Sequence, residues 1–235
     1  VALKTLGIRP GDEVIVPALT YIATANAVLY QHATPVLADV EPDTFNLDPR
    51  DVAKRITPRT RAILAIDYGG QSADYDALAK IARDAGVHLV EDGAQSIGAE
   101  YKGRALCSFG VVNTISFHAA KVITSVEGGM VLTEDDELAA RARIIRNQGE
   151  DPVKKYYHVL LGHNYRMTDL HAAIGLVQFG KLARVLQRRA EIAAYYTQQL
   201  ADLEDRIILP RVRPTNKHAW FFYAIRIKNR DEIVR

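Results

Sequence analysis

Two ionisable residues, Asp92 and Lys121, each follow a segment that predicts a β-strand. Asp92 follows residues 87–90 with one residue between them, and Lys121 lies shortly beyond residues 113–116. In an open α/β sheet, ligands bind at the carboxyl ends of the strands, so we expect both side chains at one edge. A lysine beside apolar groups can lose its proton and form a Schiff base with a carbonyl. An aspartate is the usual partner of the pyridine nitrogen of pyridoxal phosphate (PLP), so the pair fits that cofactor.

Each of these residues, taken alone, has a structural alternative. A lone lysine is most often a solvated surface charge, and a lone aspartate after a strand is most often a turn residue or a helix cap. Ser116, at the end of its predicted strand, could be a strand-end hydroxyl without a ligand. Only the combination of these residues and their order along the chain therefore indicates a cofactor site.

The elements that must position these residues follow from the alternation of short β-rich segments with helical patterns. This alternation is typical of an α/β fold with a mostly parallel central sheet flanked by helices. We expect strands at residues 13–16, 34–39, 61–66, 87–90, 113–116 and 129–133. We expect helices at residues 23–32, 49–56, 74–85, 134–146, 168–179 and 182–203. Residues 154–165 predict a long loop, and residues 220–227 predict a further strand.

The chain predicts one large domain and the beginning of a second. We place the boundary near residue 205: residues 1–205 would form the cofactor-binding domain, and residues 206–235 would begin a small C-terminal α+β domain. Residues 1–7 are typical of the end of a helix closed by Gly7, and residues 230–235 of the start of another helix. We therefore expect the sequence to be a fragment that lacks the first part of the large domain and most of the small one.

Composition excludes several classes of protein. The 235 residues are 48% hydrophobic and 25% charged, as in ordinary globular proteins, which argues against disorder and coiled coil. The formal charge is only +2 and the charges are interspersed, so the basic stripe of a nucleic-acid-binding protein is not seen. No apolar run approaches the roughly 18 residues of a membrane helix. The one cysteine, Cys107, excludes an intrachain disulfide, fits a reducing compartment and favours the cytoplasm. No grouping of residues suggests a metal site.

Five short motifs occur in a fixed order along the chain. They are Pro17-x-x-Thr20-Tyr21, Glu91-Asp92-x-x-Gln95, Ser116-Phe-His-x-x-Lys121, Glu127-Gly-Gly-Met130 and Gly162-x-Asn164-Tyr165-Arg166-Met-Thr-Asp169. In this order the set resembles the sugar aminotransferases of the DegT/DnrJ-like family, which are fold-type-I PLP enzymes. The resemblance runs over nearly the whole chain and is specific for the family but only weakly for the substrate.

The resemblance implies a role for each matched residue around the cofactor. Lys121 would be the Schiff-base lysine and the base that moves the proton in the 1,3-shift. Asp92 would bind the pyridinium nitrogen, Gln95 the phenolic oxygen, and the Ser116 hydroxyl the phosphate. Tyr21 would stack on the pyridine face, with a core tyrosine as its alternative.

Three further residues are implied to contact substrate or a second subunit. His118 could contact substrate, although a structural histidine is an equal alternative. Asn164 and Arg166 match a segment that reaches across a dimer interface in the family, Asn164 toward the partner's cofactor phosphate, so a homodimer with shared active sites is implied. Alternatively, the two residues only cap the following helix.

The family also holds the phosphate with a Gly-Thr or Gly-Ser turn at the start of an early helix. The sequence begins inside that helix, so this turn is not part of it. We therefore expect weak PLP binding by the chain alone.

The leading functional hypothesis is transfer of an amino group from glutamate or glutamine to a nucleotide-linked keto-deoxyhexose. One alternative keeps the cofactor and takes a cyclitol ketone such as an inosose as acceptor. A related branch of the family, which dehydrates sugars, has histidine in place of the lysine, and Lys121 argues against it. A third hypothesis is a non-catalytic homologue that retains only the fold, since a shared fold does not establish a shared activity.

Overall fold

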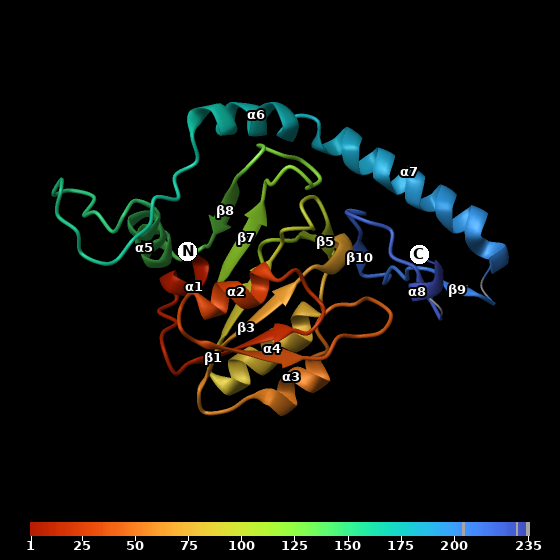
Figure 1. The fold of residues 1–235 in the computed structure, drawn as a ribbon, viewed down its shortest axis with the longest axis horizontal. Coiled ribbons are helices and arrows are strands. Elements are labelled where there is room, and N and C mark those ends of the chain that lie inside the picture. Colours follow the sequence, from red (N-terminus) through yellow and green to blue (C-terminus); the bar gives the residue numbers. More distant parts are fainter. Residues whose placement is uncertain (204, 229, 234–235) are drawn as a thin grey trace.

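A computed structural model of the chain describes residues 1–203, 205–228 and 230–233 (Figure 1). The strands of its central sheet are β1 (Glu13–Pro17), β2 (Thr34–Ala38), β3 (Thr60–Ile66), β4 (His88–Asp92), β7 (Val112–Ser116) and β8 (Gly129–Leu132). Their order is β2-β1-β3-β4-β7-β8. All neighbouring strands are parallel except β7 and β8, which pair antiparallel. The α/β fold with a mostly parallel central sheet is therefore confirmed.

Two small sheets lie outside this central sheet. One contains β5 (Glu100–Tyr101), β6 (Arg104–Ala105) and β10 (Asn216–Lys217), and the other contains β9 (Ile207–Ile208) and β11 (Arg226–Ile227). The pairing of β10 with β5 joins the C-terminal part of the chain to the region that follows β4.

The α-helices are α1 (Ala2–Thr5), α2 (Ala23–Leu29), α3 (Pro49–Arg55), α4 (Tyr75–Ala85), α5 (Asp136–Arg146), α6 (Asp169–Phe179), α7 (Leu182–Leu200) and α8 (Arg230–Ile233). Two short 3₁₀ turns, η1 (Tyr68–Gly70) and η2 (Ala201–Leu203), complete the described elements. The helix ends follow from local chemistry. Asp48, Asp74 and Thr168 are N-caps whose side chains accept a hydrogen bond from the first turn, and Gly86 closes α4 in the left-handed conformation.

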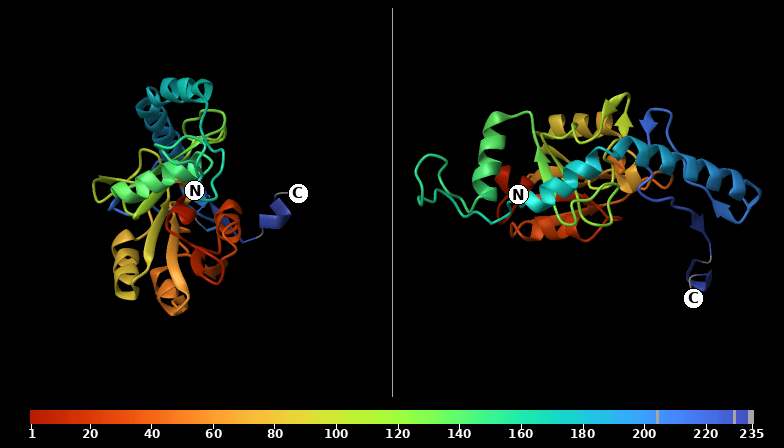
Figure 2. Two further views of the ribbon diagram at one scale, coloured as in Figure 1. Left: turned by 90° about the vertical axis from the view of Figure 1, so that its left-hand side faces the viewer. Right: turned by 90° about the horizontal axis from the view of Figure 1, so that it is seen from above.

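Helices cover both faces of the sheet, and alternating residues of the strands face them. On one face, Ile63 and Leu89 pack with residues of α3 and α4; on the other, Leu64 and Val90 pack with residues of α1 and α2. Figure 2 shows α3 and α4 on one side of the strands and α1 and α2 on the other. Because side chains alternate along a strand, consecutive residues of β4 serve different layers.

Helices α6 and α7 run one after the other across the top of Figure 1, above β7 and β8. No described residue of α6 is buried. Within the residues that the structure covers, no helix combines the length and the apolar character that crossing a bilayer requires.

Two predicted elements differ from the structure. Of residues 220–227, only β11 is a strand; the preceding aromatic residues run as irregular chain beside η1, where backbone groups of Phe221 and Ala219 bond to Gly69 and Gly70. Partners far away in the sequence thus override the β-propensity of these aromatic residues. The helix predicted over residues 23–32 ends at Leu29, and His32 has a left-handed φ of 55° that stops a helix.

Candidate active site

The site begins at the carboxyl end of β4, where Asp92 is the last strand residue. Its Oδ1 accepts a hydrogen bond of 3.0 Å from the Ala94 N–H. The paired residue on β7 is Thr114, whose hydroxyl also lowers the pKa of Asp92. Asp92 and Thr114 line a cavity of about 1150 Å³ on the α1–α2 face of the sheet. The carboxyl end of β4 therefore presents an acidic group to a space large enough for a small-molecule ligand.

Burial and charge act in opposite directions on the Asp92 carboxyl. Burial raises its pKa, while the Ala94 N–H, the charge of Lys121 and the Thr114 hydroxyl all favour the ionised form. This combination is typical of a functional carboxylate. The group is buried away from water, but its partners stabilise the negative charge.

Lys121 lies in the loop that follows β7, where its N–H donates to the His118 carbonyl at 2.9 Å. Burial lowers the pKa of its ammonium, and the negative charge of Asp92 partly offsets this effect. Each of the two residues thus shifts the pKa of the other, so the two charges lie within electrostatic reach. An amine with a lowered pKa is more often neutral, and a neutral amine can act as a nucleophile or a base.

Gln95 is buried, and its amide is oriented by the backbone. Its Oε1 accepts a hydrogen bond of 2.6 Å from the Gly69 N–H. Since the oxygen is used in this way, the Nε2 group is the end that can donate to a ligand, and no hydrogen bond within the described part of the chain uses it. This orientation suits the predicted role of Gln95 as a donor to an oxygen of the cofactor.

Ser116 and His118 form the start of the loop that carries Lys121. The Ser116 Oγ accepts from the His118 N–H at 3.3 Å, and the His118 Nδ1 accepts from the Ala120 N–H at 3.2 Å. The His118 Nε2 lies 3.7 Å from a carboxylate oxygen of Glu127. His118 therefore has a structural role in shaping the loop, and its contact with substrate stays a prediction.

Tyr21 lies just before α2, with a side chain that is 71% exposed. The alternative of a core tyrosine is therefore wrong. An exposed aromatic ring at this edge of the sheet is available for stacking, and that role stays a prediction.

Asn164 and Arg166 belong to the segment whose residues His163, Tyr165 and Met167 line the same cavity as Asp92. Asn164 forms an isolated bridge with Asn147, just after α5, and the Arg166 Nη1 donates to the Asn147 Oδ1 at 2.5 Å. The alternative that these residues cap the following helix is wrong, because the cap of α6 is Thr168. Their predicted contact with a partner's site is not tested by a single chain.

Several residues of the site carry no signal that local patterns could reveal. Thr114 is identified only by its register opposite Asp92. Gly69 and Phe221 are brought to Gln95 and Lys121 by the tertiary fold. No group of three or more metal-binding side chains occurs in the part of the chain that the structure describes.

The comparison with protein families decides the classification of this site. The model of the DegT/DnrJ/EryC1/StrS aminotransferase family matches residues 1–235. The chain belongs to this family. The motif resemblance is thereby confirmed, while the roles of Asp92 and Lys121 stay predictions.

Individual members of the DegT/DnrJ/EryC1/StrS family are similar over nearly all of the chain. GDP-perosamine synthase of Caulobacter vibrioides is 44% identical over 239 residues, which cover 100% of this chain and 64% of that protein. UDP-2-acetamido-2-deoxy-3-oxo-D-glucuronate aminotransferase of Pseudomonas aeruginosa is 39% identical over 97% of this chain and 63% of its own length. NtdA of Bacillus subtilis, solved with bound cofactor PMP, is 32% identical with a TM-score of 0.91, covering 99% of this chain and 53% of that chain. The chain thus spans less than two thirds of the length of these relatives.

Proposed function

We propose that this protein is a PLP-dependent aminotransferase that transfers an amino group from glutamate or glutamine to a nucleotide-linked keto-deoxyhexose. The observation that carries the proposal is the mutual electrostatic effect of Asp92 and Lys121 at one edge of the sheet. The relatives that act on or produce nucleotide-linked sugars favour the same class of acceptor over a cyclitol ketone.

The residues present fit PLP by the chemistry of their functional groups. A lysine amine with a lowered pKa, a buried carboxylate and an oriented amide are the groups that its aldehyde, ring nitrogen and phenolic oxygen require. Lys121 would hold the aldehyde carbon, Asp92 the ring nitrogen, Gln95 the phenolic oxygen and Ser116 the phosphate, with Tyr21 over the ring face. When bound, PLP supplies an electron-withdrawing ring that stabilises negative charge next to the amine being transferred.

The protein's own contribution is to hold and move protons. The Lys121 Nζ, once displaced by the amino donor, would take a proton from one carbon and return it to another, which requires a neutral amine. Burial of Lys121 favours that neutral form. The Asp92 carboxylate would keep the ring nitrogen protonated, and its hydrogen bond from the Ala94 N–H orients it.

The half-reaction with the amino donor tests this function. The full-length protein, loaded with PLP and freed of excess cofactor, should release 2-oxoglutarate from glutamate in an amount equal to its active sites. Lys121→Ala should release none. Lys80→Ala serves as the matched control, because Lys80 is an exposed lysine paired with Asp84 on the surface of α4. A folded, PLP-loaded protein that forms a 2-oxo acid from neither glutamate nor glutamine would instead support a non-catalytic homologue.

The acceptor is then tested with a panel of keto compounds. We expect the aminated, cofactor-loaded enzyme to convert nucleotide-linked keto sugars and to leave inososes unchanged. Preferential amination of an inosose would replace the sugar-nucleotide assignment by the cyclitol alternative while leaving the transaminase assignment intact.

We further propose that the enzyme is a homodimer with shared active sites. Helix α6 supports this proposal: it is apolar on most of its circumference, and Leu170, Leu176 and Phe179 are exposed. A helix of this kind is normally covered by another surface. Asn164 and Arg166, which precede α6, would then reach the partner's site.

We also propose a cellular location and a domain boundary for this protein. We infer a cytoplasmic location, in keeping with the single, buried, unbonded thiol of Cys107. We also propose the domain boundary near residue 205. Its support is that β9 and β11, both beyond it, pair with each other, although β10 pairs with β5 of the large domain.

A further inference from the structure

An aromatic ring covers the amine of Lys121. The Nζ lies over the Phe221 ring, 5.0 Å from its centroid. A cation within about 6 Å of a ring centroid is attracted by the negative face of the ring. Phe221 is one hundred residues further along the chain, so this contact is a product of the tertiary fold.

The backbone of Phe221 is tied to the same turn that orients Gln95. The Phe221 N–H donates to the Gly69 carbonyl at 2.8 Å, and the Gly69 N–H donates to the Gln95 Oε1 at 2.6 Å. Next to it, the Ala219 N–H donates to the Gly70 carbonyl at 2.8 Å. One turn therefore fixes both the residue that covers the amine and the amide predicted to bind the cofactor.

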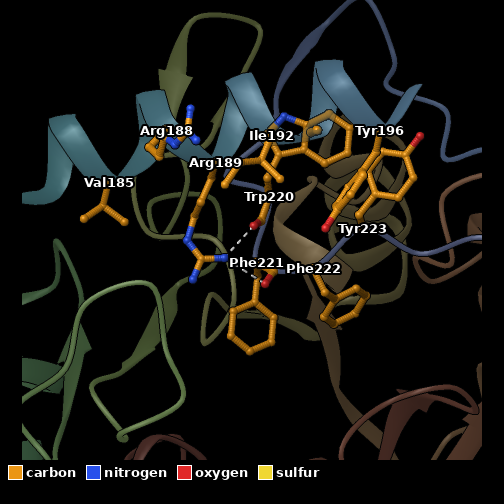
Figure 3. A pocket seen from close by; sticks show the side chains of 10 residues that line it. Val185, Arg188, Arg189, Ile192, Tyr196, Trp220, Phe221, Phe222 and Tyr223 are labelled. Carbon is orange, nitrogen blue, oxygen red and sulfur yellow. Dashed lines mark hydrogen bonds between the residues drawn. The ribbon is translucent and has the colours of Figure 1, made fainter. Parts of the chain in front are cut away.

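Helix α7 fixes the other side of this segment. The Arg189 Nη1 donates to the carbonyls of Trp220 and Phe221, at 2.8 and 3.0 Å (Figure 3). Figure 3 shows the side chains of Trp220 and Tyr223 beside α7, whereas the Phe221 ring points away from that helix. A charged donor shared by two carbonyls is stronger and more directional than a neutral hydrogen bond.

The ring has two opposing effects on the amine. Its face attracts the charged form, while its bulk keeps water away and so favours the neutral form. The other ionisable groups near Lys121 are few. Asp92 faces it from β4, His118 and Glu127 pair with each other on its own loop, and Arg189 is a cation behind the Phe221 segment.

We propose that Phe221, held by Arg189 and Gly69, is a positioning residue that places the Lys121 amine over the site and sets its protonation. This inference rests on the proposed function only in taking Lys121 as the reactive amine. It gives a function to the aromatic segment within residues 220–227, which the sequence predicts to be a strand.

Substitutions at Phe221 that separate the two effects test the proposal. The apparent pKa of Lys121 is measured without cofactor, from the pH dependence of its acetylation by trace acetic anhydride and peptide mass spectrometry. Phe221→Leu keeps the bulk and removes the π face, so the pKa should fall. Phe221→Ala admits water, so the pKa should rise. Phe221→Tyr keeps the ring and should leave the pKa unchanged.

Controls keep this test decisive. Tyr223→Phe alters the same segment on its α7 side and should not move the titration of Lys121. Circular dichroism establishes that each variant is folded. If the Ala variant does not fold, the Leu and Tyr variants still decide. A Lys121 pKa that is equal in the Leu variant and the wild type, or higher in the Leu variant, would overturn the proposal.

Two adjacent arginines provide a matched pair for the second anchor. Arg189→Met removes the donor to both carbonyls, so the ring should loosen and the Lys121 pKa should rise. Arg188→Met serves as control, because Arg188 pairs only with Glu191 on the surface of α7 among the described residues. Equal effects of the two substitutions would contradict the role of Arg189. Since no readout uses transamination, these results stand apart from any failure of the half-reaction.

Discussion

The buried carboxyl groups of Asp67 and Glu91 lie close enough in the core to influence each other's pKa, on the sheet face opposite Asp92. Glu91 accepts from the backbone N–H groups of Cys107 and Phe109, the latter at 2.8 Å, and these fixed donors favour its ionised form. Among the described residues, the Asp67 side chain accepts hydrogen bonds only from hydroxyl groups, those of Tyr75 and Ser96, both at 2.7 Å. We therefore expect Glu91 to be the ionised member of this pair and Asp67 to hold the shared proton.

Substitution of the two acids should have unequal effects on stability. Asp67→Asn retains an acceptor and a donor in place of a protonated carboxyl, so we expect a loss of about 1 kcal/mol or less. Glu91→Gln turns an NH₂ group toward one of two backbone N–H donors, so we expect a loss of about 1.5–3 kcal/mol. Urea unfolding monitored by circular dichroism measures both. A larger loss in the Asp67 variant would place the shared proton on Glu91 instead.

The same pair predicts how stability depends on pH. Burial raises the pKa of Asp67 well above its ordinary value, so over the interval between the unfolded and folded pKa values the folded state binds more protons than the unfolded state. The contribution of this group to stability is therefore complete below the ordinary carboxyl pKa and is lost as the pH rises through the folded value. Urea unfolding at a series of pH values should show a smaller decline in Asp67→Asn than in the wild type, and parallel curves would refute the assignment.

Gly70 should not tolerate a side chain. Its φ of 101° already disfavours other residues, and an added Cβ would lie 3.0 Å from the Gln95 carbonyl oxygen and 3.2 Å from the Phe221 nitrogen. Gly103 has a φ of 78° and open space around it, so an alanine there would have the same kind of backbone strain but no close contacts. We expect Gly103→Ala to cost about 1–2 kcal/mol and Gly70→Ala to cost more and to weaken PLP binding. Thermal unfolding and cofactor titration measure the difference, and equal losses in both would show that the close contacts are unimportant.

The exposed face of α6 predicts the effect of a charge on assembly. Leu176 is 74% exposed, and a carboxylate placed there would be buried without a partner in a dimer formed through α6. Leu176→Asp should shift the protein toward monomer in light scattering after size exclusion. The control is Leu37→Asp on β2, the edge of the sheet far from β8. Dissociation by the control alone would place the interface elsewhere.

The sequence by itself determined the local elements and predicted the two central residues of the candidate site. Caps such as Asp74 and Gly86, and the apolar runs of the parallel strands, act on neighbouring residues and are therefore visible in short windows. Asp92 and Lys121 could be found because carboxyl ends of adjacent parallel strands meet at one edge. The remaining relationships were decided only by the tertiary structure. The Phe221 ring over Lys121 and the electrostatic coupling of Asp67 to Glu91 join residues far apart along the chain. No local pattern encodes such contacts, since they arise from the packing of whole elements.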